Sequence, residues 1–236
     1  MKKILILAVL LIVFPLLSGC GQQAEKSERK AELKTFDEKV GYVLGLDIGR
    51  SLKETGTNID LATFYQGIED SLNEKAQVMG DDEIETTKRE FSKKIQQDYE
   101  KKMKTIAVKN LEEGKAFFAD NKDKEGVVTT ESGLQYTVLV KGDGPMPKAT
   151  DMVKVHYSGK LLDGKEFDSS YKRDEPAKFR VNGVINGWTE ALQLMPVGSK
   201  YKLFIPADLA YGEREVGPDI GPNSTLVFEV ELLGIE

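Results

Sequence analysis

The segment 153–170, with the sequence VKVHYSGKLLDGKEFDSS, constrains the fold of this chain more than any other stretch. Its first residues alternate between apolar and polar side chains, as in a β-strand with one buried face. Asp163 and Gly164 follow as a two-residue hairpin signal, after which Phe167 and Asp168 re-enter the sheet. The segment therefore predicts two paired strands joined by a tight turn.

The sequence around this hairpin predicts a small α+β domain. A first strand is expected from Leu134 to Val140, where apolar residues alternate with polar ones. Strands that follow one another around a single short helix indicate an antiparallel sheet wrapped over that helix. We expect further strands at 153–161, 177–181, 200–205 and 225–233, a short helix at 188–195 and a long loop at 206–223.

Three helices are expected before this domain. Thr35 and Glu38 have the spacing of a capping box, and a second helix start follows at Asp60. A third stretch without proline runs from Asp81 to about Asn121, which would give a rod of roughly 60 Å. A coiled coil is the alternative for this stretch, but its apolar positions keep no strict heptad. We interpret it as a solvated stalk between the first helices and the α+β domain.

The first 30 residues predict export and a lipid anchor. Lys2 and Lys3 precede an apolar run at 4–17, which has the layout of a signal peptide and is short for a membrane span. The next residues resemble the bacterial lipoprotein box, which implies cleavage before Cys20 and diacylation of this residue; a lone buried Cys is the alternative. The polar segment 21–30 is expected to be a flexible tether. We therefore expect a protein of the cell envelope, lipid-anchored to a bacterial membrane, which is the outer membrane if the cell is Gram-negative.

Composition excludes several classes of function. The net charge of −6 gives no electrostatic support for a nucleic-acid partner. One Cys and one His exclude a zinc cluster built from this chain alone, and they exclude an intramolecular disulfide. The sequence has no phosphate-binding loop, so ATP use is not expected. We expect no cofactor and no metal.

Four blocks of the carboxy-terminal half, at 153–170, 184–206, 210–212 and 221–233, closely resemble the FKBP-type peptidyl-prolyl cis-trans isomerases. The segment 41–73 resembles the amino-terminal domain of bacterial FKBPs of the macrophage-infectivity-potentiator type, which implies a homodimer of intertwined helices. Together with the patterns above, the resemblance predicts a signal peptide at 1–19, a tether at 20–30, a helical dimerisation domain at 31–80, a long connecting helix at 81–122 and an isomerase domain at 123–236.

The resemblance also implies a pocket for proline-containing polypeptides that are unfolded or exported. Trp188 would form its floor beneath the proline ring, while the backbone N–H of Ile185 and the hydroxyl of Tyr211 would hold substrate carbonyls. Asp168 would lie beside the twisting amide. The catalytic residues implied are Tyr157, Phe167, Asp168, Ile185, Trp188, Tyr211 and Phe228, and the substrate-binding residues are Val184, Arg173 and Ile220, the last in a loop that overhangs the pocket.

The sequence departs from many family members in this region. Ala177 stands where many have a pocket Phe, and Val216 and Asp219 replace more apolar or His-containing positions of the loop. Macrolide inhibitors of the family are therefore candidate ligands whose affinity the resemblance does not fix.

The implied reaction breaks no bond, so it needs neither a nucleophile nor a metal. The barrier to rotation about a peptide bond is about 18–20 kcal/mol, and a thousandfold acceleration needs only about 4 kcal/mol. A site that binds the twisted amide better than the planar one supplies this. One well-placed hydrogen bond in an apolar pocket is of that order.

Three alternatives accompany this hypothesis. The chain could be a dimeric binding chaperone with incidental isomerase activity, or a surface interaction lipoprotein that uses the domain as a scaffold. A hydrolase triad of His156, Asp168 and Ser169 or Ser170 is disfavoured. Residues that are neighbours on one strand do not provide a triad's geometry, and no nucleophile elbow is present.

Overall fold

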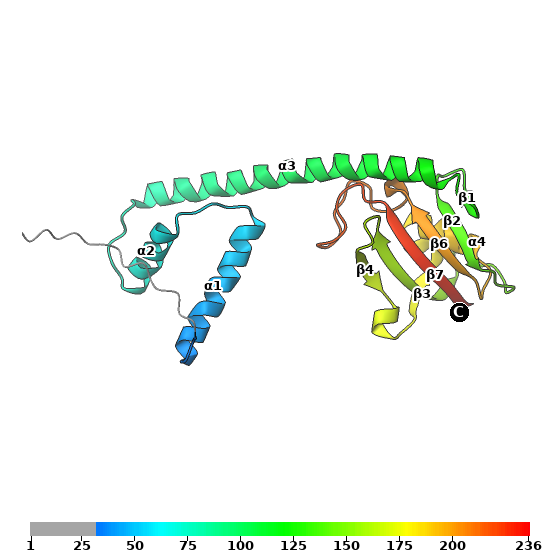
Figure 1. Cartoon of the computed structure of the whole chain (residues 1–236), viewed down its shortest axis with the longest axis horizontal. Coiled ribbons are helices and arrows are strands. Elements are labelled where there is room, and N and C mark those ends of the chain that lie inside the picture. The colour runs from blue at the N-terminus through cyan, green and yellow to red at the C-terminus, as the bar shows by residue number, and fades with distance from the viewer. Residues whose placement is uncertain (1–31) are drawn as a thin grey trace, which may run out of the picture. The chain divides into compact units, whose positions relative to one another are not determined.

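A computed structural model describes residues 32–236 and divides the chain into two units, Met1–Gly56 and Thr57–Glu236 (Figure 1). The predicted signal peptide at 1–19, the lipidation site Cys20 and the tether at 20–30 lie outside the described residues. Each unit is described by itself below.

Helix α1 spans Phe36–Glu54 and begins at the predicted capping box. The backbone N–H of Glu38 donates to Thr35 Oγ1 over 3.2 Å, and the Glu38 carboxylate accepts from the backbone N–H of Thr35 over 3.0 Å. The helix ends before Gly56, whose φ of 65° lies in the left-handed region. No residue of α1 is buried. Its exposed large apolar side chains are Phe36, Val40, Tyr42, Val43, Leu44, Leu46 and Ile48.

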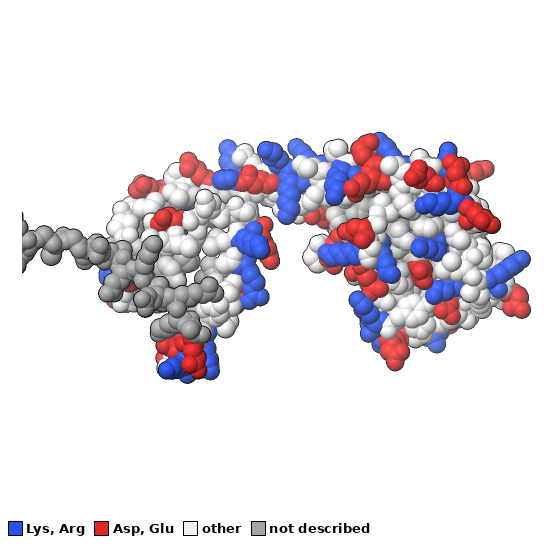
Figure 2. All heavy atoms as spheres, in the orientation of Figure 1, with Lys and Arg blue, Asp and Glu red and all other residues white. Residues whose placement is uncertain are grey.

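The second unit opens with helices α2, Leu61–Leu72, and α3, Asp81–Asn121. The side chain of Asp60 caps α2, because Asp60 Oδ1 accepts a 2.8 Å hydrogen bond from the backbone N–H of Thr63. Both helix starts, and the end of α3 at Asn121, lie where the sequence predicted them. The 41 residues of α3 give a length of about 60 Å. Figure 2 shows acidic and basic side chains interspersed along it.

None of the helices described within residues 32–236 combines the length and the apolar character that crossing a membrane requires.

The carboxy-terminal part of α3 packs on the sheet and belongs to the head of the second unit. The Phe117 ring lies 5.4 Å from the Phe204 ring, centroid to centroid. Asn121 donates a buried 2.9 Å hydrogen bond to the side chain of Gln135, which in turn donates to the backbone carbonyl of Phe118 over 3.1 Å. The stalk that the sequence predicts is therefore joined to the head by side-chain packing as well as by the chain.

The head is an antiparallel sheet with strand order β1-β2-β6-β7-β3-β4, in which β5 also pairs with β3. Its central pair is β3 with β7, which run beside each other over nearly their whole length. The predicted α+β domain with an antiparallel sheet is confirmed. The strands are β1 Val127–Thr129, β2 Gln135–Val140, β3 Met152–Leu161, β4 Glu166–Ser169, β5 Ala177–Arg180, β6 Lys200–Ile205 and β7 Leu226–Ile235.

Helix α4, Asn186–Leu194, packs on one face of this sheet (Figure 1). The sequence predicted this helix at 188–195, so it starts two residues earlier than expected. Its buried residues Trp188, Ala191 and Leu192 join the core formed by the inward side chains of β3, β6 and β7. The approach is close at Gly187, where an added Cβ would lie 2.5 Å from Cγ2 of Ile205. Glycine at this position lets the first turn of α4 rest on β6.

We expect Gly187→Ala to destabilise the protein, because the added methyl group overlaps Ile205 and such overpacking costs about 1–3 kcal/mol. Alanine is the better helix former by about 1 kcal/mol, so any loss reflects the clash. Urea unfolding followed by the fluorescence of Trp188, the one tryptophan of the chain, measures the change. Gly234→Ala, where the added carbon has no neighbour within 4 Å, is the matched control. Equal stability of the two variants would contradict the close approach of α4.

Candidate active site

A cavity of about 540 Å³ opens between α4, strands β3, β4, β5 and β7, and the loop that follows β6. All seven residues predicted to be catalytic line it, and so does Val184. Sequence reasoning missed the remaining lining residues. They are Phe179, Gly183, Asn186, Ala210 and Arg214.

The floor of the cavity is Trp188, on the first turn of α4, with only 4 % of its surface exposed. Three aromatic rings meet it edge to face. They belong to Tyr157 at 5.3 Å, Phe228 at 5.3 Å and Phe179 at 5.6 Å between centroids. Edge-to-face contacts of this kind fix the ring planes and exclude water. The cavity therefore offers a rigid apolar surface to a guest ring.

Gly159 on β3 makes room for two of the walls. The Phe167 and Phe228 rings pack edge to face at 5.5 Å, and they meet over Gly159. A Cβ on this residue would lie 2.6 Å from the Phe228 ring and 2.7 Å from the Phe167 ring. The absence of a side chain here thus allows β4 and β7 to place their aromatic residues side by side.

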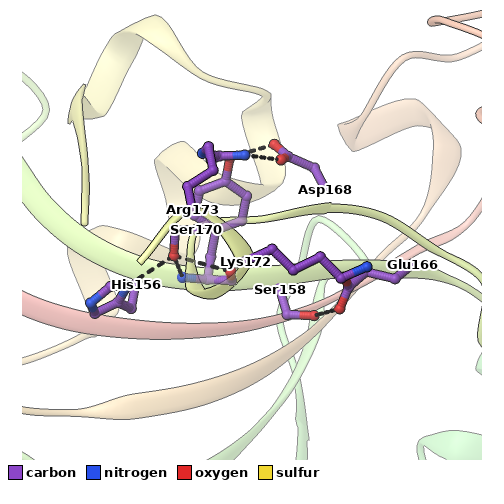
Figure 3. Close-up of polar contacts among 8 residues, drawn as sticks. His156, Ser158, Glu166, Asp168, Ser170, Lys172 and Arg173 are labelled. Atoms are coloured by element: carbon purple, nitrogen blue, oxygen red, sulfur yellow. Dashed lines mark hydrogen bonds and ion pairs between the residues drawn. The ribbon is translucent and has the colours of Figure 1, made fainter. Parts of the chain in front are cut away.

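One wall of the cavity is polar and consists of Tyr157 and Asp168, with Arg173 bonded to Asp168 from outside the cavity (Figure 3). The Tyr157 hydroxyl donates to Asp168 Oδ2. Arg173 Nη1 donates to Asp168 Oδ1 over 2.6 Å, and its Nη2 donates to the Tyr157 hydroxyl over 3.0 Å. Arg173, predicted to bind substrate, does not itself line the cavity, so it acts here by fixing the carboxylate of Asp168.

This network separates the protonation states of its members. Burial raises the pKa of Asp168, but hydrogen bonds from Tyr157 and Arg173 together with the charge of Arg173 outweigh burial and leave that pKa below its ordinary value. Burial, and then the hydrogen bond to Asp168, raise the pKa of Tyr157. Near neutral pH the wall therefore presents a charged carboxylate beside a neutral phenol.

Further hydrogen-bond donors surround the cavity. Ile185 is the residue before the first turn of α4, where helix N–H groups have no partner within the helix. The Tyr211 hydroxyl makes no hydrogen bond to another described residue. Trp188 Nε1 is buried without a partner among residues 32–236. A guest with carbonyl groups can satisfy donors of this kind.

Ile220, like Arg173, is a predicted substrate-binding residue that the structure does not place in the lining of this cavity. It is 6 % exposed in the core of the head and pairs with Val216 in an isolated β-bridge. It borders a neighbouring cavity that faces α3. The sequence showed that Ile220 lies in the loop after Tyr211, but it did not show to which side the loop turns this residue.

Phe179 had a signal in the sequence that was not used. Strand residues two apart face the same side of a sheet, so Ala177 and Phe179 share a face of β5. Ala177 was noted as a missing aromatic residue, and Phe179 supplies an aromatic ring two positions later, against Tyr157 and Trp188. Arg214 carried no such signal, because its place in the cavity depends on the fold of the loop.

The hydrolase alternative fails, although one reason given against it was wrong. His156 Nδ1 does lie 3.0 Å from Ser170 Oγ (Figure 3). However, Ser170 is fully buried and its hydroxyl accepts from the backbone N–H of Tyr157 over 2.7 Å, while Asp168 is engaged by Arg173. Neither Ser170 nor the buried Ser169 therefore offers an accessible nucleophile. Nor do the described residues contain a cluster of His, Cys, Asp or Glu that could hold a metal ion.

Two known protein families match this chain. Residues 144–233 match the family described as FKBP-type peptidyl-prolyl cis-trans isomerase. Residues 37–138 match the domain described as amino terminal to FKBP-type peptidyl-prolyl isomerase. The matches follow the boundary between the helices and the sheet only approximately, because the second includes β1 and part of β2.

Similar proteins cover most of the chain. The FKBP-type peptidyl-prolyl cis-trans isomerase FkpA of Aeromonas hydrophila is 49% identical over 214 residues, 88% of this chain and 79% of that protein. Outer membrane protein MIP of Legionella longbeachae is 40% identical over 204 residues, 86% of this chain and 88% of that protein. The crystal structure of FkpA from Escherichia coli matches with a TM-score of 0.69 at 43% identity, covering 87% of this chain and 99% of that structure.

We expect the ion pair of Asp168 to stabilise the fold in a pH-dependent way. Because the pKa of Asp168 is lowered in the folded state, its contribution is present above the ordinary value of about 3.9 and is lost as pH falls through the lowered pKa. The difference in unfolding free energy between the native protein and Asp168→Asn should therefore be largest near about pH 6 and shrink toward about pH 2.5. Asp208→Asn, at an exposed carboxylate outside the cavity, is the control. A difference that stays constant with pH would contradict the pairing.

Proposed function

Since the chain belongs to the FKBP-type peptidyl-prolyl cis-trans isomerases of the FkpA and Mip type, we propose that the cavity above Trp188 is where it turns the peptide bond that precedes proline. Family membership establishes the reaction and its proline-containing polypeptide substrates. The observation that carries the proposal for the site is the closed set of edge-to-face aromatic rings around Trp188.

Catalysis by this cavity rests on selective binding of the twisted amide. Rotation removes the conjugation of the amide nitrogen, and the apolar walls of Phe167 and Phe228 favour the less polar, twisted state over a water-solvated planar one. The proline ring lies on Trp188, whose fixed plane orients the bond. The aromatic walls thus lower a barrier of about 18–20 kcal/mol without forming any covalent bond.

The polar groups of the cavity hold the substrate around the twisting bond. The N–H of Ile185 and the hydroxyl of Tyr211 donate to substrate carbonyls on either side of the proline, which keeps the flanking chain in place. The carboxylate of Asp168 lies beside the amide, held there by Tyr157 and Arg173. The Asp168 side chain is 42 % exposed, so its charge acts more strongly on the amide only once the bound substrate displaces the surrounding water.

The chain without its first 20 residues should accelerate isomerisation of a leucyl-prolyl peptide, and variants of the cavity should be slow. Asp168→Ala, Trp188→Phe and Tyr211→Phe should each lower kcat/KM about tenfold or more, the equivalent of one well-placed hydrogen bond or contact surface. Tyr136→Phe, which removes a hydroxyl from a tyrosine that stacks on Tyr201 outside the cavity, should be unaffected. A protease-coupled peptide assay measures all four. Full activity of folded Trp188→Phe and Asp168→Ala would refute the assignment of the site.

The amino-terminal helices supply a second part of the function, the binding of another copy of the chain. The homodimer forms through residues 31–80. Neither α1 nor α2 buries a residue, and their exposed apolar side chains include Leu44 with 56% and Tyr65 with 70% of their surface exposed. Apolar surface of this extent marks an interaction site. In the dimer, the cleft between the two stalks binds unfolded exported proteins, so chaperone activity accompanies isomerisation.

Leu44→Glu should separate the dimer into monomers, because a buried unpaired carboxylate in the interface is strongly unfavourable. Sedimentation velocity measures the oligomeric state, with Lys53→Glu at the polar end of α1 as the control. The monomer should keep its kcat/KM toward a short peptide and lose its ability to suppress aggregation of an unfolded protein. If Leu44→Glu stays dimeric, or if the native chain is itself a monomer, the dimer through residues 31–80 is wrong.

The protein works in the cell envelope, with diacylated Cys20 anchoring it to a membrane and residues 21–30 as its tether. The layout of residues 1–20 supports this location, and one relative carries the name outer membrane protein. Macrolide inhibitors are candidate ligands of the cavity above Trp188, since it offers an apolar floor together with free donors. The binding-chaperone and surface-interaction alternatives differ from this proposal in that they do not need Asp168 or Tyr211.

A further inference from the structure

The loop between β6 and β7, which carries Tyr211, is bonded at one end to helix α3. Asn110 on α3 donates through Nδ2 to the backbone carbonyl of Pro222 over 2.8 Å and to Ser224 Oγ over 3.3 Å. In the opposite direction, Asn223 donates through Nδ2 to the backbone carbonyl of Ala107 over 3.4 Å. Two asparagines therefore cross-link α3 and the end of the loop.

Asn223 also connects this end of the loop to the residue after Tyr211. Its backbone N–H donates to the carbonyl of Gly212 over 2.7 Å. Its φ of 55° lies in the left-handed region, which asparagine enters more readily than most residues. One residue thus joins α3, through its side chain, to the backbone beside Tyr211, through its N–H.

Steric contacts support the same end of the loop. A Cβ on Gly221 would lie 3.1 Å from Cγ2 of Ile106, and a Cβ on Gly114 would lie 2.6 Å from Oγ1 of Thr225. Both glycines therefore lie at close contacts between α3 and the segment that leads from the loop into β7. Further along the loop, the Tyr99 hydroxyl donates to the Glu215 carboxylate.

Between these points the loop is not packed firmly on the helix. A cavity of about 430 Å³ is bordered by Met103 and Ile106 of α3 and by residues 217–221 of the loop. Apolar packing against α3 therefore does little to fix the middle of the loop, which is held on the other side by the burial of Ile220 in the core of the head. The Lys165–Asp219 ion pair of 2.6 Å also fastens the loop to the head. On the side of α3, the two asparagine side chains and the Tyr99 hydroxyl make the polar contacts that set its position.

We propose that Asn110 and Asn223 are positioning residues for catalysis, because they make α3 the support of the loop that presents Tyr211 to the substrate. The inference rests on the role of Tyr211 proposed above. It extends the active site to the helix that the sequence analysis interpreted as a stalk alone. The position of α3 against the head then bears directly on the position of a group that binds substrate.

The test compares Asn110→Ala, Asn223→Gly and Asn223→Asp in the full chain without residues 1–20. Asn223→Gly keeps the left-handed backbone and the N–H to Gly212 and removes only the side chain. Asn223→Asp keeps the size, but a carboxylate cannot donate to the Ala107 carbonyl. Each variant should lower kcat/KM for the leucyl-prolyl peptide about fivefold, the equivalent of one lost hydrogen bond. Lys104→Ala, at an exposed residue of the same helix, is the control.

The decisive measurement repeats each change in a Tyr211→Phe background. If the asparagines act through Tyr211, they should cause no further loss once its hydroxyl is absent, whereas a general structural loss would persist and multiply. Independent, multiplying losses in folded variants would overturn the inference and leave the proposed site intact. Unchanged kcat/KM for all three asparagine variants would overturn it as well. A Tyr211→Phe enzyme as fast as the native one would refute the role of Tyr211, and the inference with it.

Discussion

The pairing of β3 with β7 is the constraint on which the head depends. Its register places Gly159 opposite Phe228 and Tyr157 opposite Val230, so that inward side chains of both strands share one face. A shift of one residue would turn each of these side chains to the other side of the sheet. The same register leaves room at Gly159 for the Phe167 ring from β4. The cavity is therefore a product of strand pairing first and of α4 second, since α4 adds Trp188 to walls that the strands have already set.

Much of this architecture could be predicted because it depends on residues that lie close together in the sequence. Thr35 and Glu38 satisfy each other's backbone N–H groups within one turn, so the start of α1 is visible in four residues. Asp60 marks the start of α2 for the same reason. The long uninterrupted helical pattern up to Asn121 needs no partner to be recognised. The family resemblance, also carried by contiguous blocks, is confirmed over both the helical and the sheet part of the chain.

The remainder depended on contacts between distant residues. Ile220 and Tyr211 lie in one loop, yet the fold turns Ile220 toward α3 and Tyr211 toward the cavity. The hydrogen bond between His156 and Ser170 joins two neighbouring segments that sequence reasoning had treated as one strand. The contacts of Asn110 with Pro222 span more than a hundred residues. None of these leaves a periodic pattern, because each involves a single polar or apolar side chain whose partner is chosen by the fold.

The continuity of α3 has a mechanical consequence. Between Asp81 and Glu113 the helix contains neither glycine nor proline, the residues at which helices usually kink. Its carboxy-terminal end is held to the sheet by Phe117 and Asn121, so the junction between the helix and the head is packed and does not act as a hinge. Any reorientation of the head relative to the amino-terminal part of α3 must therefore occur by gentle bending of the helix over many turns. Such a helix transmits torque along its length. Bending of α3 would therefore displace the loop between β6 and β7, which is hydrogen-bonded to its side.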